Sequence, residues 1–214
     1  MVGSLRMTKL DFVTMKSQYT MYLILAIIVL LFAIMNSSVT VLCFTCSWFV
    51  ALTSSNIFAI QEKNNLNRLY GSLSVNLKDI VLGRYISVCL NYIISFLVII
   101  VLYSGFTLFQ NKEMNLQEVL FGFSLSFLIF SVIVGIQMPV FFKMGYTKAK
   151  VWSLVPFVAV MSLVVIPSYV DALSGVIEFM MSNKSVLIIC CTLASCIIQF
   201  VSYNISVVAY RKGR

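Results

Sequence analysis

The residues best placed to do metal or redox chemistry are two cysteines, Cys43 and Cys46, which have the spacing of a metal-binding or redox pair. The chain of 214 residues contains no histidine and no second pair that would complete a zinc site. These two cysteines and the four others all fall inside apolar runs. We therefore interpret the six cysteines as small packing residues and predict no metal site.

Other catalytic groups are also missing from the sequence. Without histidine there is no serine or cysteine nucleophile with a histidine base. The nearest basic glycine segment, 145–150, lacks the second glycine of a phosphate-binding loop. No apolar run contains paired carboxylates that could relay protons or sodium ions. These absences argue against an enzyme and against an ion-driven carrier, and we expect no cofactor in this chain.

The elements that position the remaining polar residues are membrane helices. The chain is 61% hydrophobic and only 10% charged, with a mean hydropathy of +1.01, whereas about a quarter of a soluble domain is charged. The apolar runs are continuous, which favours helices over barrel strands. We predict a single all-α integral membrane domain over 1–214 with six transmembrane helices, at about 20–35, 39–60, 85–109, 118–142, 152–170 and 185–209.

The basic residues predict the orientation of these spans. Six spans place both termini on one side, and every lysine and arginine except Lys112 and Lys184 falls on that side. Positive residues stay in the cytoplasm, so we expect a multi-pass membrane protein with both termini on the cytoplasmic side. The same asymmetry explains the net charge of +8 without nucleic-acid binding. We also expect an interfacial N-terminal helix and a short amphipathic helix at 171–184 on the outer side.

A long polar stretch at 61–85 separates the second and third spans. We predict that the second helix continues to Leu69 and that Gly71 ends it. Asn76 then caps a new helix, with Asp79 at its third position as in a capping box. The result is a cytoplasmic helix-turn-helix elbow, and a second basic elbow at 143–150 projects on the same face.

Three patches of the sequence carry a resemblance to a known family. They are Leu10-Asp11, Glu62-Lys63 followed by "LYGSLSVNLKDIVLGRY", and "PVFFKMGYTKAK" after the fourth span. With the six-span plan, the chain resembles the small permease subunits of bacterial type-2 ABC exporters. One position departs from that pattern, because Ser74 stands where the signature has proline.

The resemblance implies a partner and a coupling surface. Such permeases pair with a second permease, identical or homologous, and sit in membrane lipid on two copies of a separate ABC ATPase, which binds ATP and magnesium. The segment 69–73 would insert into a groove of the ATPase. The coupling residues implied by the resemblance are Glu62, Arg68, Leu69, Tyr70, Gly71, Leu73, Lys78 and Arg84, with a secondary contact at Met144, Gly145 and Tyr146.

Uncharged polar residues inside the spans are candidates for a substrate path. Thr53, Asn56 and Gln137 could meet the polar groups of a cargo, or they could form hydrogen bonds between helices. Since no charge lies deep in the spans, we expect an amphipathic or apolar cargo. The resemblance implies export across the bacterial cytoplasmic membrane, because small permeases of this kind often export peptides, bacteriocins or hydrophobic drugs. We therefore expect export of an amphipathic peptide, a bacteriocin or a lipophilic compound.

Two other functions remain open from the sequence. One is the substrate-capture subunit of an energy-coupling-factor importer, although the outer loops here are short. The other is a membrane immunity or sensor protein that transports nothing.

Overall fold

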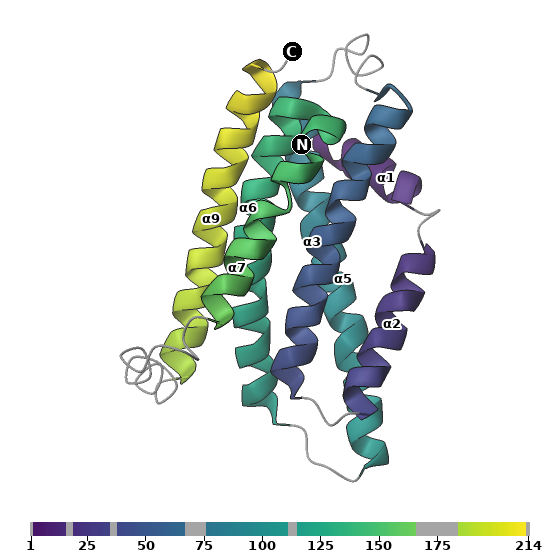
Figure 1. Ribbon diagram of the computed structural model, residues 1–214, viewed down its shortest axis with the longest axis vertical. Coiled ribbons are helices and arrows are strands. Elements are labelled where there is room, and N and C mark those ends of the chain that lie inside the picture. The colour runs from purple at the N-terminus through teal and green to yellow at the C-terminus, as the bar shows by residue number, and fades with distance from the viewer. Residues whose placement is uncertain are drawn as a thin grey trace.

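The computed structural model describes residues 2–15, 19–34, 38–66, 76–110, 115–165 and 184–212, and all of its regular elements there are helices. In chain order they are α1 (Val2–Met15), α2 (Tyr19–Ile34), α3 (Val39–Lys63), α5 (Leu77–Phe109), α6 (Leu116–Trp152), α7 (Val155–Val165) and α9 (Lys184–Lys212). Figure 1 shows the longer helices running side by side along one axis, with α1 crossing near one end.

Four of these helices, α3, α5, α6 and α9, are long and apolar enough to cross a membrane. The apolar part of α2 within the described residues is shorter, at Tyr22–Phe32, and α7 has 11 residues. The chain is therefore an all-α membrane protein, and the full count of six spans remains a prediction. The expected outer helix at 171–184 lies outside the described residues except for Lys184, which begins α9.

The starts and ends of the helices follow local sequence signals. Asn76 caps α5 by accepting a hydrogen bond from the backbone N–H of Lys78, as predicted. The prediction that α3 continues to Leu69 is wrong. The helix ends at Lys63, and Asn65 adopts the left-handed conformation (φ 51°), which halts the helix earlier than a glycine at position 71 would.

Small residues and aromatic rings pack the bundle. α6 and α9 approach closely at Gly135, where an added Cβ would lie 3.1 Å from the Ile198 side chain. Ser202 of α9 donates a hydrogen bond to the backbone oxygen of Gly135 at 2.7 Å. Between α5 and α6, the Tyr92 ring stacks on Phe130 with ring centres 4.5 Å apart. Cys43 and Cys46 are buried in the same core as unpaired thiols, so they act as packing residues.

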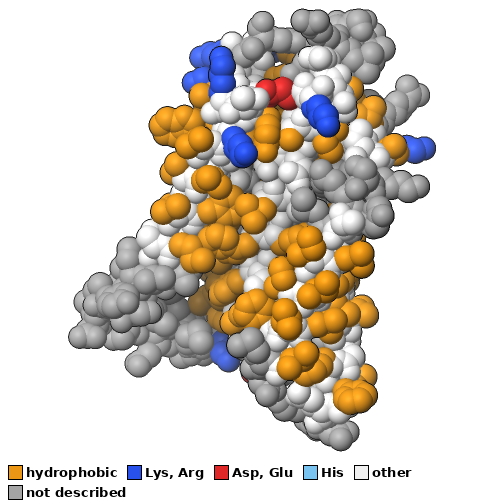
Figure 2. Space-filling model, turned by 45° about the vertical axis from the view of Figure 1, so that its right-hand side comes forward, with side chains coloured by type: hydrophobic (Ala, Val, Ile, Leu, Met, Phe, Trp, Pro, Cys, Tyr) orange, Lys and Arg blue, Asp and Glu red, His pale blue; other side chains and the backbone are white. Residues whose placement is uncertain are grey.

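The bundle has a polar end and an apolar body. The start of α1, the end of α9 and the elbow at 143–150 lie at the same end in Figure 1. On the face drawn in Figure 2, most of the lysines and arginines lie near that end, and hydrophobic side chains cover the body. We call this end the polar end. It brings together the elbow at 143–150 and the end of α3, which is a described part of the polar stretch 61–85.

Candidate functional site: a coupling surface at the polar end

Glu62 joins the two polar elbows. Its carboxylate Oε2 accepts hydrogen bonds from the backbone N–H of Tyr146 at 2.6 Å and of Thr147 at 3.2 Å. The hydroxyl of Thr147 donates to Oε1 of the same carboxylate. The end of α3 is thus tied to residues more than 80 positions later in the chain.

The geometry of Gly145 explains why the elbow needs a carboxylate. Gly145 has φ 75° and ψ 172°, and this breaks the helical path inside α6. The short helical segment 146–152 begins anew after the break, so its first N–H groups have no acceptor within their own helix. Glu62 supplies that acceptor from α3 and places a negative charge at the positive end of the segment, as an N-cap residue does within one helix.

A column of aromatic rings runs inward from the elbow. Tyr146 stacks on Phe141 with centres 6.0 Å apart, and Phe141 stacks on Phe58 at 4.9 Å. Phe58 lies one turn before Glu62 on α3, so the same face of that helix supports both the elbow and the column. The rings of Phe58 and Phe141 are almost completely buried. The elbow is therefore in stacked contact with the buried core.

The inner end of the column is a buried ion pair. The guanidinium of Arg84 lies 5.0 Å above the Phe58 ring. Its Nε is 3.0 Å from Oδ2 of Asp11 on α1, and each side chain is only 1% exposed. The Ser87 hydroxyl donates a hydrogen bond to the same Asp11 Oδ2, also at 3.0 Å. Burial raises the pKa of the Asp11 carboxyl, and the charge of Arg84 and the Ser87 hydrogen bond lower it in part.

Close packing fixes α1 against α5 beside this pair. A Cβ added to Gly83 would lie 2.7 Å from Met7 Cβ and 2.9 Å from the backbone oxygen of Ser4, so only glycine fits. The Thr8 hydroxyl donates hydrogen bonds to the backbone oxygens of Ser4 and Gly83. The first helix is thus connected, through Arg84 and the ring column, to the elbow at Tyr146.

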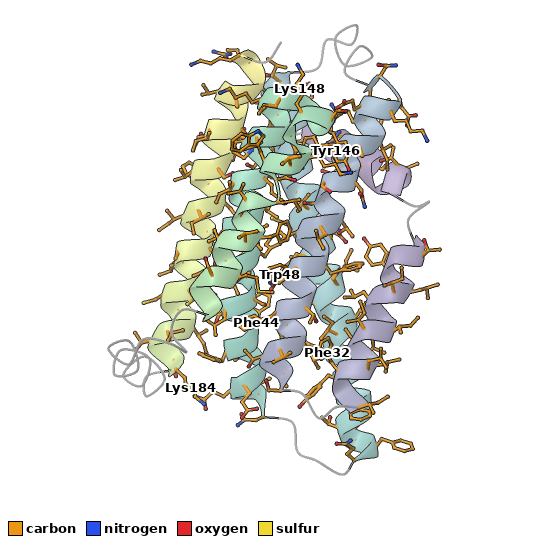
Figure 3. All side chains as sticks on the ribbon, in the orientation of Figure 1. Phe32, Phe44, Trp48, Tyr146, Lys148 and Lys184 are labelled. Carbon is orange, nitrogen blue, oxygen red and sulfur yellow. The ribbon has the colours of Figure 1, made fainter. Side chains whose placement is uncertain are left out.

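The structure corrects one predicted coupling residue. The resemblance implied that Arg84 contacts the ATPase, but its side chain lies in the interior, where Asp11 pairs with its charge. Lys78 and Met144 are exposed at the polar end, as a surface contact requires. Figure 3 shows Tyr146 and Lys148 at this end and Lys184 at the opposite one. Arg68, Leu69, Tyr70, Gly71 and Leu73 lie outside the described residues.

The candidate path residues are bonded within the protein. Thr53 is buried, and its hydroxyl donates to the backbone oxygen of Val50 in its own helix. Gln137 is also buried and donates from Nε2 to the backbone oxygen of Ser153, where α6 ends. Asn56 is partly exposed. For Thr53 and Gln137 these contacts favour packing, and the role of all three in a path stays a prediction.

Several residues of the site were not found by sequence reasoning. Asp11 entered only as part of a resembling patch, and Phe58, Phe141 and Thr147 were not singled out. Each acts through a partner on another helix, so neither spacing nor composition marks it. The only local signal was the glycine at 145 inside a helical pattern.

Comparison with known proteins agrees with the membrane-spanning helices found in the structure. A family model described as "ABC-2 family transporter protein" matches residues 6–211. No curated protein and no solved structure shows significant similarity to the chain. The match covers α2, α3, α5, α6 and α7 in full and most of α1 and α9. The chain is therefore a member of the ABC-2 transporter family and a transmembrane permease subunit of an ABC transporter.

Proposed function

We propose that this permease exports an amphipathic peptide, a bacteriocin or a lipophilic compound, using ATP hydrolysed by a separate ATPase. Two permease subunits with six spans each, and two ATPases on their cytoplasmic faces, would form the complete transporter in a bacterial cytoplasmic membrane. Both termini and both elbows would face the cytoplasm, where the ATPase binds.

The observation that carries the coupling role is the hydrogen-bonded bridge from Glu62 to Tyr146 and Thr147. A loop that only connects two spans needs a few residues, whereas this end of the molecule ties two distant elbows together. The bridge continues through the stacked rings to the Arg84–Asp11 pair. A push by an ATPase on either elbow would therefore reach α1, α3, α5 and α6 together.

The choice of cargo rests on the absence of charged residues from the predicted spans. The segments 20–60, 85–111, 119–142, 151–170 and 185–210 contain no Asp, Glu, Lys or Arg. Moving an ion through them without a partner would cost several kcal/mol. An amphipathic molecule avoids much of this cost, because its apolar part can rest against Phe, Met and Ile side chains.

Transport in proteoliposomes tests the proposal. The permease is reconstituted with the ABC ATPase that co-purifies with it, and ATP is supplied on the side that carries the ATPase. We expect ATP-dependent movement of a fluorescent amphipathic peptide and not of a charged sugar phosphate. Movement of the small hydrophilic solute alone would overturn the cargo assignment.

The same preparation separates the competing functions. Family membership favours the permease over a substrate-capture subunit. A protein that only sequesters a peptide would bind it without ATP-driven movement. Stimulation of the ATPase by the peptide, together with transport, would therefore argue against an immunity or sensor role.

A further inference from the structure

A groove of about 440 Å³ lies between α6 and α9, next to the elbow at 143–150. Its lining residues are Lys143, Asn204, Ile205, Val208, Ala209 and Lys212. Lys143 comes two residues before the break at Gly145, and Lys212 is the last residue of α9. The groove therefore opens at the polar end, where the predicted spans leave the membrane.

The two lysines of this groove are available to a ligand. Both side chains are exposed, and neither forms an ion pair with any residue that the structure describes. They lie on different helices, so together they flank the groove rather than one helix face. Two ammonium groups of this kind suit a phosphate group.

The floor of the groove suits a hydrocarbon chain. Ile205 and Val208 are 52% and 55% exposed, and Ala209 lies beside them. Lys212 is one helical turn beyond Val208, toward the end of the chain. An apolar surface below a pair of cations is complementary to a lipid with an anionic headgroup. The phosphate of such a lipid stays at the interface while its acyl chain enters the bilayer.

We propose that this groove binds an anionic phospholipid of the cytoplasmic leaflet. The phosphate lies between Lys143 and Lys212, and an acyl chain follows Ile205 and Val208. The bound lipid links the end of α9 to the last turn of α6 before the elbow. A free nucleotide or sugar phosphate fits less well, because Asn204 is the one uncharged polar side chain among the lining residues and the others between the two lysines are apolar.

Native mass spectrometry of the purified permease in detergent tests the site. The protein is titrated with phosphatidylglycerol, phosphatidylcholine and free glycerol phosphate. We expect phosphatidylglycerol to bind most tightly, and glycerol phosphate to bind weakly because it lacks a chain. Equal affinity for phosphatidylcholine, or equal affinity for glycerol phosphate, would overturn the proposal.

Matched variants locate the binding. Each lysine near an anionic headgroup contributes about fivefold in affinity, so Lys143→Gln with Lys212→Gln should weaken phosphatidylglycerol binding by about 25-fold. The control, Lys148→Gln with Arg211→Gln, removes the same charge from exposed residues that do not line the groove. Equal weakening in the two double variants would show a general surface charge effect and refute the site.

A third variant tests the apolar part without changing the charge. Val208→Trp fills the groove from a position that is 55% exposed, so the fold should tolerate it. We expect at least tenfold weaker binding of phosphatidylglycerol and an unchanged melting temperature. Unaltered binding by this variant would contradict the acyl-chain contact.

Discussion

Replacing Glu62 with alanine should release the elbow while the bundle stays folded. The carboxylate provides the acceptor for the backbone N–H groups of Tyr146 and Thr147 and for the Thr147 hydroxyl. Hydrogen bonds to a charged group contribute about 1.5–3 kcal/mol each when buried, and much less at a surface, where water and salt screen them. Since Glu62 is exposed, we assign about 1–2 kcal/mol to the whole bridge.

Amide hydrogen exchange measures this loss directly. A local destabilisation of about 1–2 kcal/mol speeds exchange by roughly 5–30-fold, and the effect should be confined to the amides of the elbow. Glu62→Gln keeps an oxygen acceptor but removes the charge, so it should give an intermediate rate. Glu118→Ala, which removes an exposed carboxylate from the first turn of α6, is the matched control. Unchanged exchange at Tyr146 and Thr147 in Glu62→Ala would refute the bridge.

The remaining predictions concern other parts of the coupling surface. Asp11→Leu leaves Arg84 buried without a counter-charge, at a cost of about 3–5 kcal/mol in folding free energy. Adding Arg84→Met should recover most of the lost melting temperature. A double variant no more stable than the single one would contradict the pairing. Gly145→Ala forces a side chain into a conformation that glycine alone adopts readily, which should cost about 1–3 kcal/mol. In the assembled complex this variant should reduce the transport achieved per ATP hydrolysed. Transport per ATP equal to that of the unaltered protein would show that the break in the helix is dispensable. Tyr70→Asp with Leu73→Asp should abolish co-purification of the ATPase while the permease still inserts into the membrane, and an unchanged yield of complex would rule out the contact at 69–73.

Local signals predicted part of this fold correctly. Asn76 was found as the cap of α5 because the asparagine side chain can accept a hydrogen bond from the N–H groups of the first helical turn, which depends only on neighbouring residues. The apolar runs predicted the four long helices, since span length depends only on composition over about 20 residues. These features require no knowledge of what another helix contributes.

Features that depend on a second helix were predicted poorly. Arg84 looked like a surface residue because arginine is rarely buried without a partner, and its partner Asp11 is more than 70 residues earlier on another helix. The end of α3 was misplaced because Asn65 adopts a left-handed conformation, and an asparagine is a less obvious stop signal than a glycine. Glu62 was predicted at the coupling surface, but its role as a cap for a distant helical segment depends on packing between α3 and α6.

Site-specific photo-crosslinking tests the central claim most directly. A photoreactive amino acid is placed at Met144, which is an exposed residue of the elbow. In a separate variant it is placed at Phe109, which is 91% exposed at the end of α5 away from the polar end. If the elbows form the coupling surface, the ATPase in intact membranes should be crosslinked from position 144 and not from position 109. Crosslinking from position 109 with none from position 144 would place the ATPase at the wrong end and contradict the account.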